Sequence, residues 1–99
     1  MLYAITGTDA PASLPGRLAA RAAHLARVSQ LRDEGRLVLA GPHPRIDTSE
    51  PGEAGYSGSL IIAEFASLAD AEAWAAADPY MAAGVWAEVG VKPFIQVMP

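Results

Sequence analysis

Apolar and polar residues alternate with two different spacings along this 99-residue chain, and the spacing changes where glycines and prolines occur. Short apolar, β-prone runs indicate strands, whereas apolar residues three or four positions apart indicate helices. Glycine and proline mark the turns between them. In chain order we expect a strand at 2–6, a helix at 14–34, strands at 37–40 and 59–65, a helix from Ser67 to Ala77, a helical turn at 81–84 and a strand at 85–91.

The first predicted helix carries its own start and stop signals. Ser13 is a favoured capping residue, Pro15 is tolerated in a first turn, and Gly35 suits the left-handed position that ends many helices. The apolar side chains at helical spacing are Leu14, Leu18, Leu25 and Val28. We expect this face to pack on the sheet.

The second predicted helix begins with a pair that resembles a capping box, Ser67 and Asp70. It is broken at Asp78-Pro79, because a proline restricts the residue before it to an extended backbone. A later proline, Pro93, lies near the end of the last strand, where we expect a sheet edge or a bulge.

The predicted order of elements, β-α-β-β-α-β, is that of the ferredoxin-like α+β fold. Its four-stranded antiparallel sheet carries both helices on one face. The third strand is nonetheless apolar on both sides, since Leu60 and Ile62 alternate with Ile61, Ala63 and Phe65. We therefore expect a homodimer with two-fold symmetry, formed sheet against sheet. The alternative is a monomer with an exposed apolar patch, which would favour aggregation.

Composition and charge narrow the class of protein. Apolar residues make up 52% of the chain and charged residues 18%, which indicates one globular domain over residues 1–99. The net charge of −4 and the lack of a basic patch argue against nucleic acid as a partner. Because there is no cysteine, disulfides and thiolate catalysis are excluded. We see no signal peptide or apolar span, and expect a cytoplasmic protein without a membrane partner.

The segment 41–58 is the longest irregular stretch predicted, with four glycines and three prolines. A loop of this length in so small a domain is more often functional than idle. We expect it to cover a binding site and exclude water.

His24 is the candidate for acid–base chemistry; one other histidine, His43, occurs in the chain. At 100° per residue, His24 lies near the edge of the apolar face of the first helix, where we expect the margin of a cleft. A histidine there is partly desolvated yet reachable, and it can transfer a proton near neutral pH. The alternative is a boundary histidine that is hydrogen-bonded only to a backbone carbonyl.

Three aspartates could orient His24, namely Asp47, Asp70 and Asp78. Asp70 is already assigned to the helix cap. Asp78 is the more specific candidate, because Pro79 restricts its backbone and because it follows a helix expected beside that of His24. It could equally cap the turn that starts at Pro79, and the two roles are compatible. Asp47, in the long loop, could close over the site or serve only in a turn.

Further polar residues are candidates for holding a ligand. Arg17 and Arg21, one turn apart, could bind an anion, although such residues more often form a solvated helix face. Ser59, which follows Gly58, could offer a hydroxyl group and a nearby backbone amide. Tyr80 could line the cleft or only pack in the core.

The remaining histidine and the tryptophans have simpler interpretations. His43 lies between two prolines, and no metal-binding spacing joins it to His24, so we expect no metal site. Trp74 and Trp86 are expected to be packing residues.

Four segments closely resemble the YciI-like (YCII-related) family in their order and spacing: MLYAITGTDA, RAAHLARVSQLRDEGRLVLAGP, GYSGSLIIAEFASLADAEAWAAADPYMAAGV and VKPF. The resemblance covers the chain from Met1 to about Val97. It implies a dimeric α+β barrel of ferredoxin-like subunits, with a cleft around a His–Asp pair.

The family's motifs fall on specific positions of this sequence. The R-x-x-H-L motif implies roles for Arg21 and His24, and the D-P-[YF] motif implies a role for Asp78. The G-S pair that opens the third strand falls on Gly58 and Ser59. Similar dimeric barrels include muconolactone-isomerase-like enzymes, monooxygenases and a dehydrochlorinase-type branch, but shared fold is weak evidence for chemistry.

Together these features predict a small cofactor-independent enzyme in which His24, oriented by Asp78, acts as general base or acid. The expected reaction is an isomerisation or elimination on a small molecule that Arg21 and Ser59 position. The alternative is a non-catalytic module that binds a small ligand or another protein through the same cleft. Haem-linked redox activity has little support, because no additional apolar pocket accompanies the histidine.

Overall fold

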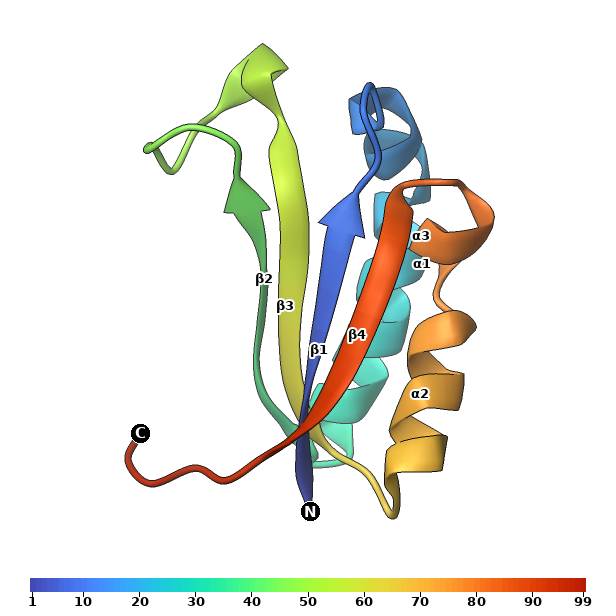
Figure 1. Cartoon of the computed structure of the whole chain (residues 1–99), viewed down its shortest axis with the longest axis vertical. Coiled ribbons are helices and arrows are strands. Elements are labelled where there is room, and N and C mark those ends of the chain that lie inside the picture. Colours follow the sequence, from blue (N-terminus) through green and yellow to red (C-terminus); the bar gives the residue numbers. More distant parts are fainter.

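The protein, a computed structural model that describes all 99 residues, is a single antiparallel sheet covered on one face by helices (Figure 1). The strands have the order β2-β3-β1-β4. This is the predicted ferredoxin-like α+β arrangement, which is confirmed. The elements are β1 (Leu2–Asp9), α1 (Leu14–Asp33), β2 (Leu37–Pro44), the 3-10 turn η1 (Gly52–Ala54), β3 (Tyr56–Glu64), α2 (Leu68–Ala76), α3 (Pro79–Ala82) and β4 (Trp86–Phe94).

Two strands extend into the segment that was predicted to be a long loop. β2 continues to Pro44 and β3 begins at Tyr56, so only residues 45–55 connect them. Within this hairpin Pro42 pairs with Ser59. Proline is tolerated because β2 is an outer strand, where one row of backbone groups needs no partner. The prediction of one irregular loop was therefore wrong.

The face of α1 that packs on the sheet also differs from the prediction. Leu18 and Leu25, which the apolar spacing assigned to the core, are 61% and 39% exposed. Ser13 occupies the N-cap position, but its side chain makes no capping hydrogen bond. The residues of α1 that are buried are Arg17, His24, Val28 and Leu31. Two polar side chains thus take core-facing positions, and the partners that allow this are described below.

The local signals around α2 and α3 are confirmed. The Ser67 hydroxyl accepts the Asp70 N–H at 3.1 Å and caps α2. The Asp78 carboxylate accepts the Tyr80 N–H at 2.9 Å and caps α3. Pro93 lies in β4, the other outer strand. None of the helices combines the length and the apolar character that crossing a membrane requires.

Trp86 is a buried residue on which the aromatic side chains of the site pack. Its indole is buried against β1 at Gly7, where an added Cβ would lie 2.5 Å from Nε1 and 2.7 Å from Cδ2. The indole N–H is the one buried side-chain polar atom without a hydrogen-bond partner. Its ring meets the rings of His24 and Tyr80 edge-on, at centroid distances of 5.8 and 5.6 Å. The absence of a side chain at Gly7 therefore sets how deep the aromatic residues of the site lie.

Candidate active site

A cavity of about 240 Å³ opens between α1 and the β2–β3 side of the sheet. The exposed leucines Leu18 and Leu25 contribute apolar surface to it, and no aspartate or glutamate lines it. The polar residues of the lining are Arg17, Arg21, His24, Tyr56, Ser59 and Tyr80. On a chain with net charge −4, the cavity therefore combines an apolar wall with positive charge.

His24 and Asp78 form a buried hydrogen-bonded pair beside this cavity. The His24 Nδ1 atom lies 2.9 Å from both Asp78 carboxylate oxygens, and the side chains are 8% and 0% exposed. An ionised carboxylate only accepts, so neutral His24 donates its Nδ1–H and keeps a lone pair on Nε2. Nε2 has no hydrogen bond within the chain and is not sealed from solvent. Since His24 lines the cavity, this lone pair is available there.

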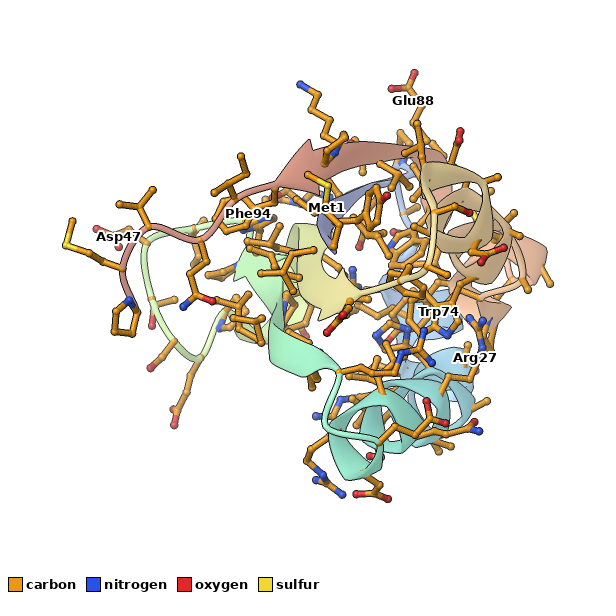
Figure 2. All side chains as sticks on the ribbon, turned by 90° about the horizontal axis from the view of Figure 1, so that it is seen from below. Met1, Arg27, Asp47, Trp74, Glu88 and Phe94 are labelled. Carbon is orange, nitrogen blue, oxygen red and sulfur yellow. The ribbon has the colours of Figure 1, made fainter.

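Arg27 is a second cationic partner of Asp78. Its Nη1 donates to Asp78 Oδ2 at 3.1 Å, and its Nη2 donates to the Trp74 carbonyl at 2.7 Å. The guanidinium lies over the Trp74 ring at 4.3 Å, and Figure 2 shows the two side chains next to each other. Sequence reasoning missed Arg27, although it follows His24 by three residues and so lies on the same side of the helix.

Tyr80 packs directly on the histidine. The two rings are stacked at a centroid distance of 4.1 Å with an interplanar angle of 13°. Burial raises the pKa of the Tyr80 phenol above its ordinary value; the charges of Arg17 and Arg21 oppose this rise, and that of Asp78 adds to it. The phenol therefore stays protonated at neutral pH. A hydrogen bond from the Arg17 side chain to the phenol oxygen also opposes the rise. Because arginine only donates, the phenol O–H remains free to donate to a ligand in the cavity.

Arg17 is buried in a fixed network and is not a free anion clamp. Its guanidinium binds both Asp9 oxygens, at 2.8 and 2.7 Å, and donates to the Ser59 Oγ at 2.9 Å and the Gly58 carbonyl at 3.2 Å. It also lies over the Tyr80 ring at 4.8 Å. The Asp9 carboxylate balances its charge. Sequence reasoning did not name Asp9 as a partner of Arg17. The spacing of seven residues does place Arg17 and His24 on one helix face.

Arg21 and Ser59 remain able to bind a ligand. Arg21 is exposed, lines the cavity, and takes part in none of the ion pairs of the chain. Ser59 is buried, and its oxygen accepts from Arg17, which leaves the hydroxyl hydrogen free to donate. The structure thus brings together His24, Asp78, Arg21, Ser59 and Tyr80, with the Gly58 carbonyl behind Arg17.

Three residues considered from the sequence lie elsewhere. Asp47 is exposed in the connection 45–55 and does not line the cavity; Figure 2 places it at the opposite end of the view from Arg27. It does not replace Asp78 beside His24, because β2 extends past its predicted end and carries this connection beyond the sheet. Asp70 serves the α2 cap, and His43 is exposed in β2. No group of three or more histidine, cysteine, aspartate or glutamate side chains is arranged to hold a metal ion.

The fold and the site define a ferredoxin-like α+β domain with a buried histidine–aspartate pair at a small cavity. This chain belongs to the YCII family, whose model, the YCII-related domain, matches residues 1–95. It is 58% identical to protein YciI of Escherichia coli and to that of Shigella flexneri, over 98% of this chain and 99% of each relative. It is 54% identical, over the same shares, to an uncharacterized protein of Haemophilus influenzae.

A solved structure extends the comparison to an enzyme. The 5-chloro-2-hydroxyhydroquinone dehydrochlorinase (TftG) of Burkholderia phenoliruptrix, in complex with 2,5-dihydroxybenzoquinone, superposes with a TM-score of 0.82. The two chains are 29% identical, and the match covers 96% of this chain and 94% of that one. The same fold therefore supports catalysis on a small ring compound in that protein.

Proposed function

We propose that this protein is a small acid–base enzyme that acts on an oxygen-bearing ring compound by elimination or isomerisation, without a cofactor. The observation that carries the proposal is the His24–Asp78 hydrogen bond, which leaves the imidazole Nε2 lone pair at the cavity. A base needs this combination of an oriented ring and an accessible lone pair. The structural similarity to a dehydrochlorinase supports the lyase type of reaction.

In the proposed step, His24 Nε2 removes a proton from a C–H or O–H group of the substrate. The electron pair of a broken C–H bond forms a new C=C bond in the ring, and that of a broken O–H bond forms a C=O bond on it. In an elimination, a leaving group such as chloride departs with the electron pair of its own bond. In an isomerisation, the imidazolium returns the proton to another atom. The Asp78 carboxylate stabilises the imidazolium that forms in either case.

The cavity indicates the class of substrate. The cavity offers three hydrogen-bond donors: Arg21, the Ser59 hydroxyl and the Tyr80 phenol. They indicate a ligand with acceptor oxygens, and the charge of Arg21 favours a negatively charged one. The leucines and the stacked aromatic residues favour a flat apolar body. A hydroxylated ring that becomes an enolate or phenolate meets both requirements, because the donors stabilise the charge where it develops.

A turnover assay tests the proposal. The protein is incubated with 5-chloro-2-hydroxyhydroquinone and with a panel of hydroxylated rings in D2O, and chloride release and deuterium incorporation are followed. Wild type is expected to exceed the buffer rate on at least one compound, and His24→Gln to lose about 10²–10⁴ of that rate. Compounds that bind but stay unchanged would instead establish the non-catalytic binding module. Equal rates in wild type and H24Q would exclude His24 as the base.

We also propose that the enzyme is a cytoplasmic homodimer joined through the open face of the sheet. Strand register places Leu39, Ile62 and Ala4 side by side, and Leu60 beside Thr6, on the face away from Tyr3 and the rest of the core. Such a continuous apolar face favours association. Sedimentation equilibrium at micromolar concentration is expected to give twice the chain mass of 10.3 kDa. A Leu60→Glu variant should shift the protein to monomer, and a monomeric wild type would overturn the proposal.

A further inference from the structure

We propose that Arg27 is a positioning residue of this site: it supplies the permanent positive charge for Asp78, so that His24 can remain a neutral base at physiological pH. This inference rests on the proposed acid–base role of His24. It adds a residue that lies outside the cavity, and it predicts how the protonation of the histidine is set.

The contacts of Asp78 show why two cationic partners compete there. Its side chain is fully buried, and it accepts hydrogen bonds from His24, from Arg27 and from the Tyr80 backbone N–H. A buried carboxylate is costly unless a positive charge balances it. Either an imidazolium at His24 or the guanidinium of Arg27 could provide that charge.

Arg27 is built to provide it at every relevant pH. A guanidinium does not deprotonate in proteins, and its planar fork can bind two acceptors at once. Here one branch binds Asp78 at 3.1 Å and the other binds the Trp74 carbonyl at 2.7 Å, while the plane lies over the Trp74 ring. With the carboxylate already paired, protonation of His24 is no longer needed to balance it. The imidazole then serves Asp78 as a neutral donor.

The other charged groups around His24 do not replace Arg27. Tyr80 is a neutral phenol, and Arg17 is bound to Asp9. The neighbours that α2 and β4 contribute are the Trp74 carbonyl and the uncharged Trp86 ring. The titratable or charged groups of the site are Arg17, Arg21 and Arg27 of α1, Asp9 of β1, Tyr56 of β3, Asp78 before α3 and Tyr80 within it.

The experiment is a pH titration of the His24 ring nitrogens by 15N NMR in wild type, Arg27→Gln and Arg27→Lys, with no ligand. Arg27→Gln removes the charge; its side chain keeps an amide donor but is shorter than that of arginine by two bonds. We expect the midpoint of the His24 titration to rise by about 1–2 pH units, because the imidazolium becomes the counter-charge of Asp78. Arg27→Lys keeps the charge and should stay within about 0.3 unit of wild type. The matched control, Arg32→Gln, removes an exposed arginine of α1 and should leave the midpoint unchanged.

The outcomes separate this inference from the function on which it rests. A wild-type His24 that is neutral with hydrogen on Nδ1, together with an unchanged midpoint in R27Q, overturns the inference and leaves the base intact. A wild-type ring with hydrogen on Nε2, or one charged at pH 8, removes the base itself. If R27Q does not fold, R27K decides: a midpoint that rises by a unit or more while the charge is kept overturns the inference. Trp74→Leu, which keeps the charge but weakens its platform, should match wild type.

Discussion

Replacing Asp78 by asparagine is the most informative change to the site, because it preserves shape and removes one acceptor. Both carboxylate oxygens are in use: Oδ1 accepts from the Tyr80 N–H, Oδ2 accepts from Arg27, and His24 contacts both. Asparagine offers one oxygen and one NH2 group. In either orientation, the NH2 group faces a donor that previously had a partner.

These contacts show which orientation of the asparagine amide costs less stability. With its oxygen toward Tyr80, asparagine keeps the cap of α3, and its NH2 group faces His24 and Arg27. His24 can adapt by moving its hydrogen from Nδ1 to Nε2, but Arg27 cannot. One charge-assisted hydrogen bond is then lost, which costs about 1.5–3 kcal/mol of stability. The tautomer change removes the lone pair from the cavity, and the analogous change in histidine-based triads lowers kcat by roughly 10⁴.

Two measurements check the prediction. Urea unfolding, at equal protein concentration, should show the loss of stability for Asp78→Asn, and Asp33→Asn, an exposed aspartate of α1, should change it by less than about 0.5 kcal/mol. 15N spectra should show hydrogen on Nε2 of His24 in D78N and on Nδ1 in wild type. If D78N kept the wild-type tautomer and turnover, Asp78 would be only a helix cap.

Three further predictions concern packing, pH and capping. Gly7→Ala should lower the free energy of unfolding in urea by about 1–3 kcal/mol, because its Cβ would overlap the Trp86 ring. The control Gly16→Ala, whose Cβ would lie 3.4 Å from its nearest atom, should stay within about 1 kcal/mol of wild type. Equal stabilities of the two variants would contradict the packing at Trp86. The pKa of Tyr80 lies above 10.0 in the folded protein, so the unfolded chain loses the phenol proton first and stability should fall as pH rises through 10. The free energy of unfolding, measured from pH 8 to 11, should fall less for Tyr80→Phe than for wild type. An equal fall in both proteins would refute this prediction. Ser67→Ala should lower the free energy of unfolding by about 1 kcal/mol, and an unchanged value would mean that the α2 cap contributes nothing.

The parts of the fold that follow from local chemistry could be predicted from the sequence. The Ser67 cap, the break at Asp78-Pro79 and the two-sided apolar character of β3 are short-range signals, and each is present in the structure. The ends of β2 and β3 could not be predicted in this way. Pro42 indicates a turn when it is considered alone, and only its place on an outer strand makes it compatible with pairing.

The site shows the same division between local and long-range information. His24 and Asp78 could be named from the sequence, but the arrangement around them depends on contacts over long separations. Arg17 meets Ser59 from 42 residues away, and Arg27 meets Asp78 from 51 residues away. Helical periodicity ranks side chains by polarity, so it placed Leu18 and Leu25 in the core. It could not foresee that polar residues with buried partners would occupy that face instead.

Prolines on both margins of the sheet limit how copies of this chain can assemble. Pro42 and Pro44 interrupt the free margin of β2, and Pro93 does so on β4. A strand from another molecule would meet missing donors on either side, so lateral growth into ribbons or fibrils is disfavoured. The proposed dimer uses the broad face of the sheet instead, and a closed pair of this kind leaves no apolar surface to which a third molecule could add.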